Sequence, residues 1–190
     1  MSATPTPTTR HPAVAFFATR FGIDERVLEE LLGLALSQGG DYADLYFEYR
    51  ENGSLLFEEQ AVKRASGGIL QGLGVRVLSG DATGYAYTEE LTRDSMRQAA
   101  RTAARIAQEA RAAPSVDVTP VGVPNHYPVE RPSVAVRAAE KVALLRRADA
   151  AARAYDPSIS RVVVSLVDEQ RYVLIATSDG RLAGDVQPML

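Results

Sequence analysis

The stretch GGILQGLGVRVLSGDATGYAYTEE, residues 67–90, places six glycines among branched and aromatic residues. Ser79-Gly80-Asp81 has the composition of a tight turn between two strands. The glycines before it mark bulges or close backbone approach, and Gly84 lets Tyr85 and Tyr87 stand beside their neighbours. The stretch therefore predicts a bent strand, a turn and a return strand that carries tyrosines.

These glycines do not fit a phosphate-binding loop. A dinucleotide fingerprint needs Gly-x-Gly-x-x-Gly at the start of a helix, whereas Gly72-Leu73-Gly74 is followed by the strand-like Val75-Arg76-Val77. A P-loop needs Gly-Lys followed by Ser or Thr, which the sequence lacks. The sequence therefore predicts no nucleotide site here.

Three amphipathic helices are expected around this hairpin. The first follows the N-cap candidate Asp24 and stops at Gly39-Gly40. The second is alanine-rich, capped by Thr92 or Asp94, and ends at Pro114, and its small side chains permit close approach to a sheet. The third lies within residues 133–155 and closes at Asp156-Pro157.

Two more hairpins are expected from alternating apolar and polar residues. Asn52-Gly53 predicts a type I′ turn in the first, and Asp168–Gln170 predicts a tight turn in the second. The element order indicates an α+β fold, with a mostly antiparallel or mixed sheet covered by about three helices on one face. We expect a flexible tail over residues 1–20 and a single domain over residues 21–190.

Composition limits the functional classes. The net charge is −3 and no run of Lys or Arg exceeds two residues, so direct binding to nucleic acid or to a membrane surface is not expected. The absence of cysteine excludes disulfides, thiolate metal sites and a cysteine nucleophile. No apolar run approaches the roughly 20 residues that span a bilayer, and we expect a cytoplasmic protein.

No catalytic, cofactor-binding or metal-binding residue is predicted. His11 lies in the expected tail, and His126, in a proline-rich connection, is read as a loop residue rather than a base or ligand. The acid pairs are adjacent in sequence, so on a strand their members point to opposite faces and cannot share a proton; they are Glu29-Glu30, Glu58-Glu59 and Glu89-Glu90. Five tyrosines can line a groove or be ordinary half-buried strand residues: Tyr42, Tyr46, Tyr49, Tyr85 and Tyr87.

Several short elements, in this order, resemble the TldD/PmbA family of metalloproteases, once described as modulators of DNA gyrase. The likeness runs from about residue 20 to the end and is closest to the amino-terminal domain of TldD rather than PmbA (TldE). Its elements are Tyr42-Ala43-Asp44-Leu45-Tyr46, Gly72-Leu73-Gly74-Val75-Arg76, Thr83-Gly84-Tyr85-Ala86-Tyr87-Thr88, the alanine-rich helix, Glu140-Lys141 before Leu144-Leu145, Asp156-Pro157, Ser178-Asp179-Gly180 and Asp185.

The resemblance implies the amino-terminal domain of a longer zinc metalloprotease that acts on unfolded or small peptides. The family's metal-binding His-Glu-x-x-x-His helix has no counterpart here, so the resemblance implies that zinc is held by a carboxy-terminal half absent from this chain, which alone is expected to be inactive. Its implied role is substrate enclosure and dimerisation, with itself or a TldE/PmbA-like partner. The alternative is a non-catalytic protein-binding module of the gyrase-modulator type.

Overall fold

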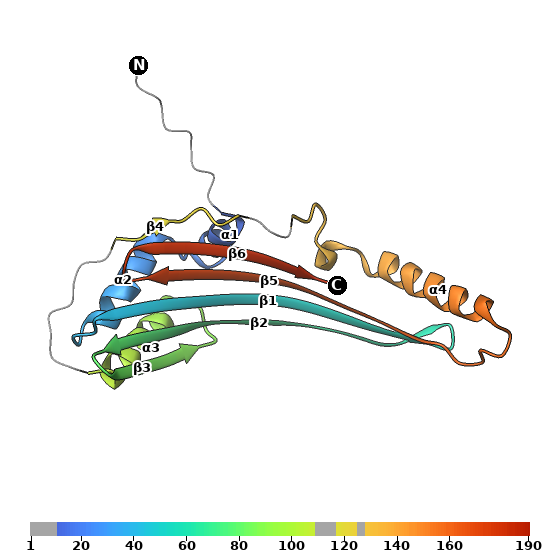
Figure 1. Ribbon diagram of the computed structural model, residues 1–190, viewed down its shortest axis with the longest axis horizontal. Coiled ribbons are helices and arrows are strands. Elements are labelled where there is room, and N and C mark those ends of the chain that lie inside the picture. The colour runs from blue at the N-terminus through green and yellow to red at the C-terminus, as the bar shows by residue number, and fades with distance from the viewer. Residues whose placement is uncertain (1–10, 109–116, 125–127) are drawn as a thin grey trace, which may run out of the picture. The chain divides into compact units, whose positions relative to one another are not determined.

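A six-stranded mixed sheet with four helices forms the framework of the computed structural model, which describes residues 11–108, 117–124 and 128–190 (Figure 1). The strand order is β3-β2-β1-β5-β6-β4; β2 and β3 are antiparallel, and β4 and β6 are parallel. This confirms the expected α+β class. The elements are α1 (Pro12–Phe21), α2 (Glu25–Leu36), β1 (Tyr42–Glu58), β2 (Ala61–Ser79), β3 (Ala82–Thr88), α3 (Arg93–Ile106), β4 (Thr119–Pro120), a 3-10 turn (Ser133–Ala135), α4 (Ala138–Tyr155), β5 (Val163–Thr177) and β6 (Arg181–Met189).

The chain divides into two compact units by the contacts between its residues, and the expected single domain over residues 21–190 stays a prediction. Of the described residues, the first unit holds 11–49, 71–108, 117–124 and 172–186, and the second holds 50–70, 128–171 and 187–190. Strands β1, β2 and β5 each contribute residues to both units. Strands this long cannot be recognised from alternation alone, because a polar stretch inside a strand looks like a loop.

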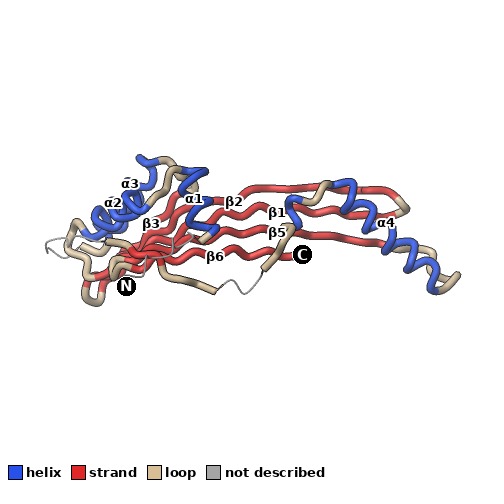
Figure 2. The backbone as a smooth tube through the Cα atoms, turned by 90° about the horizontal axis from the view of Figure 1, so that it is seen from above, coloured by secondary structure: helices blue, strands red, loops and turns tan. Residues whose placement is uncertain are grey.

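Three helices cover one face of the sheet in the first unit (Figure 2). Asp24 caps α2 as expected, since its carboxylate accepts a hydrogen bond from the Val27 amide at 3.0 Å. For α3 the cap is Thr92, whose hydroxyl accepts from the Ser95 amide; Pro114, the expected helix end, lies outside the described residues. The inward residues of β1 alternate along the strand and are fully or almost fully buried: Ala43, Leu45, Phe47 and Tyr49.

An additional helix precedes this core. Residues 12–21 form α1, although the sequence analysis assigned residues 1–20 to a tail; residues 1–10 lie outside the described part of the chain. Phe17 of α1 is fully buried, and Phe16 stacks on Tyr172 with ring centroids 4.0 Å apart. Burial of these aromatic rings offsets the entropy that the segment loses when it becomes ordered. The prolines and threonines before this segment had made it resemble a flexible tail.

The turn of the first expected hairpin is displaced from its predicted position. Asn52-Gly53 lies within β1, and the chain reverses at Glu59-Gln60, both of which have positive φ (49° and 59°). Those angles match a two-residue type I′ turn, for which Asn-Gly is the preferred sequence. The glycine at position 53 instead serves close strand packing, because a Cβ there would lie 2.8 Å from Oδ1 of Asp168.

Gln60→Gly should stabilise this hairpin by about 0.5–1 kcal/mol, because glycine adopts positive φ without the steric penalty of a side chain. Gln71→Gly is the matched control in the middle of β2, where the same change should destabilise by a similar amount. Urea unfolding of both variants measures the difference. A loss of stability in Gln60→Gly would contradict the assigned turn.

The second expected turn is also part of a strand. Residues 168–170 lie inside β5, and Asp168 and Gln170 are buried. The chain turns instead at Ser178–Gly180, with Gly180 at φ 90°. A strand that contains buried polar residues can have the same composition as a turn, so the sequence pattern alone placed the second turn wrongly. By contrast, the turn after Ser79 is where it was expected, with Gly80 at φ 54°.

Candidate functional site

The outer edge of β3 is the first candidate site. β3 pairs with β2 on one side, in the register Gly74↔Tyr87 and Arg76↔Tyr85, and its other side pairs with no strand among the described residues. An unpaired strand edge presents main-chain donors and acceptors to an extended peptide. This edge can therefore bind peptide backbone without reading its sequence.

Side chains beside this edge add a shallow hollow of about 340 Å³ between β3 and α3. Hydroxyl and amide groups line part of it, including those of Thr88, Ser95 and Gln98. Tyr85 and Tyr87 alternate with the buried Ala86 along β3 and are 58% and 72% exposed, and Tyr87 also borders the hollow. The Tyr85 ring lies across Gly74, where a Cβ would be 2.7 Å from its hydroxyl, which explains the glycine at that position.

The five tyrosines do not form a single groove. Tyr49 is buried among Phe16, Phe21 and Tyr172, on the helix-covered face of β1. Tyr42 and Tyr46 alternate with the buried residues of the same strand and so point to the opposite face. Burial raises the pKa of the Tyr42 hydroxyl, with the nearby Asp44 carboxylate adding to the effect. Tyr49 is therefore a core residue of its strand rather than part of a groove.

The histidines provide no metal centre among the described residues. The His11 side chain caps α1, since Nδ1 accepts a hydrogen bond from the Ala13 amide at 3.2 Å. His126 lies outside the described residues. Within the described ranges, no group of three or more His, Asp or Glu side chains is arranged to hold a metal ion.

The acid pairs have separate partners rather than shared protons. Glu58 accepts from Arg161, while the adjacent Glu59 is paired with Lys63. Glu90 accepts from the Ser95 hydroxyl at 2.9 Å. These acids are structural or surface groups in the described structure.

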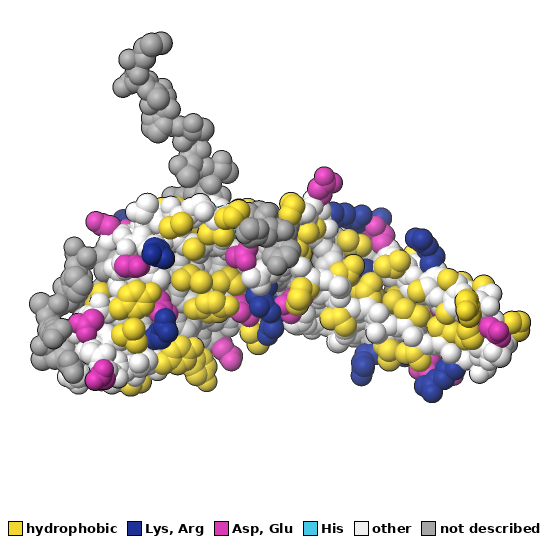
Figure 3. Space-filling view, viewed as in Figure 1, with side chains coloured by type: hydrophobic (Ala, Val, Ile, Leu, Met, Phe, Trp, Pro, Cys, Tyr) yellow, Lys and Arg dark blue, Asp and Glu magenta, His cyan; other side chains and the backbone are white. Residues whose placement is uncertain are grey.

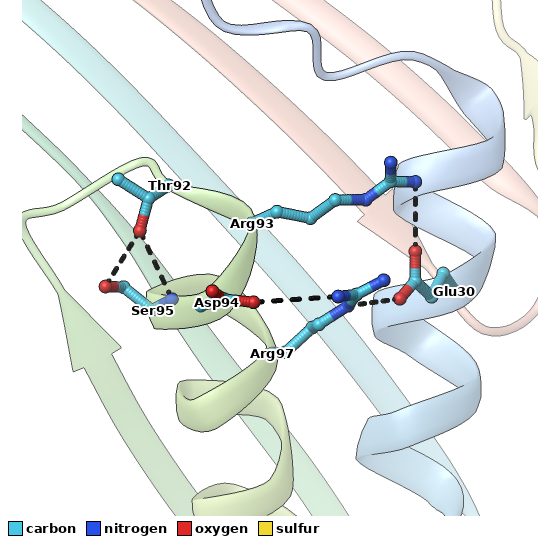
Figure 4. Close-up of polar contacts among 6 residues, drawn as sticks. All are labelled: Glu30, Thr92, Arg93, Asp94, Ser95 and Arg97. Atoms are coloured by element: carbon cyan, nitrogen blue, oxygen red, sulfur yellow. Dashed lines mark hydrogen bonds and ion pairs between the residues drawn. The ribbon is translucent and has the colours of Figure 1, made fainter.

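A cluster of charged residues joins α2 to α3 (Figure 4). The Glu30 carboxylate of α2 pairs with the guanidinium groups of Arg97 and Arg93, with N–O distances of 2.5 and 3.1 Å. The Asp94 carboxylate lies 3.6 Å from the Arg97 guanidinium. The hydrogen bond from Arg97 is the largest cause that lowers the pKa of the Glu30 carboxyl. A groove of about 580 Å³ begins at this cluster; its lining residues are Ser37, Gln38, Asp94, Arg97, Gln98, Arg101 and Arg105.

This arginine set was not predicted, because it contains no run of consecutive basic residues. The relevant signal is a spacing of four, which places Arg93, Arg97, Arg101 and Arg105 along one side of α3. The guanidinium groups provide paired donors suited to carboxylate or phosphate oxygens. The groove therefore contains donors suited to an anion, beside the acidic Asp94 that also lines it.

The second unit contains a buried ion pair between α4 and β5. Nζ of Lys141 lies 2.6 Å from Oδ2 of Asp168, with the Lys141 side chain 15% exposed and that of Asp168 2% exposed. Asp168 is the residue that sequence analysis placed in a turn. In the structure it is a buried structural anion, neutralised by a lysine from the covering helix.

Comparison with known proteins identifies the family. Residues 43–107 match domain 1 of the PmbA/TldA metallopeptidases, and residues 131–190 match the central domain of these proteins. A metalloprotease TldD homologue of Haemophilus influenzae is 35% identical over 155 residues, which are 79% of this chain and 32% of the relative. A TldD homologue of Buchnera aphidicola subsp. Acyrthosiphon pisum is 30% identical over 163 residues, 86% of this chain and 33% of the relative.

Solved structures show the same fold at low identity. A proposed modulator of DNA gyrase from Thermotoga maritima aligns with a TM-score of 0.67 at 17% identity, covering 86% of this chain and 37% of that one. TldE from Thermococcus kodakarensis aligns with a TM-score of 0.65 at 15% identity, covering 85% of this chain and 37% of that one.

The chain therefore belongs to the PmbA/TldD metallopeptidase family, which confirms the resemblance. Within that family, residues 43–107 correspond to domain 1 and residues 131–190 correspond to the central domain. The curated relatives compared above are TldD homologues. The chain spans about one third of the length of those relatives. No helix among the described residues is long and apolar enough to cross a membrane.

Proposed function

We propose that this chain is the amino-terminal part of a TldD-like metallopeptidase that acts on unfolded or small peptides. Its own residues enclose and align the substrate and contribute to a dimer, while the catalytic metal, zinc in this proposal, is bound by residues of the protein beyond this chain. The match to two domains of a metallopeptidase family carries the proposal. The edge of β3 supports it because main-chain pairing suits substrates without a defined side-chain sequence.

The partner in this proposal is a TldE/PmbA-like protein or a second copy of the chain. The structural likeness to TldE from Thermococcus kodakarensis supports a common fold for the two partners of such a dimer. Related folds can assemble with pseudo-twofold symmetry, in which equivalent surfaces meet. The proposed compartment is the cytoplasm, and direct contact with nucleic acid or membrane forms no part of the proposal.

Peptide cleavage provides the decisive test of the catalytic part. The 190-residue chain with added Zn²⁺ should not cleave a fluorogenic unfolded peptide, whereas the product of the whole reading frame, with its partner, should cleave it and lose activity in EDTA. Zinc-dependent cleavage by the pure 190-residue chain would refute the placement of the metal. A whole gene product that binds peptides but never cleaves them would favour the alternative, a non-catalytic protein-binding module.

The edge of β3 is tested separately by Tyr87→Lys. Lysine at an exposed edge position opposes the addition of another strand, so binding of a labelled unfolded peptide to the 190-residue chain should weaken about fivefold. Tyr46→Lys is the matched control on an inner strand, where no strand can be added. Fluorescence anisotropy measures both affinities, and equal effects of the two changes would contradict binding at this edge.

A further inference from the structure

Four arginines recur at every fourth position along α3, at residues 93, 97, 101 and 105. Since an α-helix has 3.6 residues per turn, such residues lie on one side, each about one turn beyond the last. The buried side of α3, which adjoins the arginine side and contacts β3 and α2, is made of small and apolar residues: Met96, Ala99, Ala100, Ala103 and Ala104. The arginine side is therefore held in a fixed orientation by the buried side.

The charges along this side are unevenly neutralised. Arg93 and Arg97 share the carboxylate of Glu30. Within the described part of the chain, no carboxylate lies within ion-pair distance of Arg101 or Arg105; the side-chain contact of Arg105 is to the hydroxyl of Thr102, at 3.3 Å. Among the described residues, the guanidinium groups of Arg101 and Arg105 thus have no carboxylate partner.

The surroundings of these two arginines form a polar groove. Gln98 of α3 lies on its wall, and Ser37 and Gln38, which follow α2, line its other side. Its volume of about 580 Å³ accommodates several side chains of a bound segment. Amide and hydroxyl groups at the wall can satisfy main-chain or side-chain groups of that segment.

We propose that this groove, defined by Arg97, Gln98, Arg101 and Arg105 with Ser37 and Gln38, binds a glutamate- or aspartate-rich segment of a partner polypeptide. Carboxylates at neighbouring positions of such a segment match the two available guanidiniums, and arginine binds carboxylates through two parallel hydrogen bonds. Arg97 stays paired with Glu30 and fixes the end of the groove. This binding is independent of the proposed peptidase role.

Charge distribution favours an acidic polypeptide over nucleic acid. A nucleic-acid surface neutralises many phosphates at once, whereas two available arginines on a chain of net charge −3 neutralise few. Figure 3 draws the face on which the strands lie in front of α2 and α3, so the groove is not on it; acidic and basic side chains are interspersed on that face. The few carboxylates of a short acidic segment can be neutralised by the arginines of the groove alone.

The test measures the affinity of the 190-residue chain for a fluorescein-labelled peptide of glutamates spaced by glycine and serine. The glutamine version of the peptide and an oligothymidylate are the comparison probes. The variant Arg101→Glu/Arg105→Glu reverses two exposed charges of the groove. Arg26→Glu/Arg64→Glu is the matched control, because both residues are exposed, neither forms an ion pair with a described residue, and the net charge changes equally.

At about 20 mM salt, the groove variant should bind the glutamate peptide about tenfold more weakly than the original chain, and the control should change it less than about twofold. The glutamine peptide should bind weakly to all three proteins. Equal affinity for the two peptides, equal effects of the two double variants, or oligothymidylate binding tighter than glutamate-peptide binding would each overturn the proposal. Circular dichroism confirms that both variants are folded before the affinities are compared.

Discussion

Lys141→Met should destabilise the second unit by about 3–5 kcal/mol, because it leaves the Asp168 carboxylate buried without its cation. Methionine has nearly the volume of lysine, so the change removes charge with little loss of packing. Asp168 is only 2% exposed, and water cannot replace the missing ammonium group without opening the structure. Urea unfolding followed by far-UV circular dichroism measures the loss.

Two further variants separate the buried charge from other causes. Lys141→Met/Asp168→Leu removes both charges and should recover most of the lost stability, since an apolar pair of similar volume replaces a buried ion pair at little cost. Arg161→Met is the matched control, because Arg161 pairs with Glu58 at 2.7 Å but is 77% exposed. It should cost less than about 1 kcal/mol. A loss in Lys141→Met no larger than in Arg161→Met would show that the pair is effectively solvated.

Local sequence signals identified α2, α3, α4 and one turn because their physical causes are themselves local. Asp24 and Thr92 were recognisable as caps because a cap needs one side-chain acceptor beside a helix start. The turn at Gly80 was recognisable because glycine is the residue that best tolerates its positive φ. Close approach of α3 to a sheet was expected from its alanines, and the structure shows that β3 is a strand it contacts.

Features that depend on residues distant in sequence could not be located in this way. Asn52-Gly53 carries a strong local turn signal, yet Gly53 lies in a strand because Asp168, more than 100 positions away, packs against it. Asp168 in turn depends on Lys141 of α4 for its neutralisation. The tyrosine-bearing strand β3 was predicted, but its place at the edge of the sheet was not. The groove needs α2 beside α3, and its arginines are not consecutive in the sequence.

Gly84→Ala should destabilise the first unit by about 3 kcal/mol, the upper end of the usual cost of overpacking. The added Cβ would collide with the carbonyl oxygen of Ala103 and lie 2.8 Å from the amide nitrogen of Ala107. Both are main-chain atoms at the last turn of α3, so no rotation of a side chain relieves the contact. The helix must move away from β3, and the buried alanines of α3 lose their packing.

Gly33→Ala is the matched control within the same unit, because a Cβ at this position of α2 meets nothing within 4 Å. It should raise stability by up to about 1 kcal/mol, since alanine has the higher helix propensity. Adding Ala103→Gly to Gly84→Ala should not restore stability, because the clashing oxygen belongs to the backbone and remains. If the double variant recovers the loss, or if Gly84→Ala and Gly33→Ala have equal effects, then the close contact between α3 and β3 does not explain why position 84 is glycine.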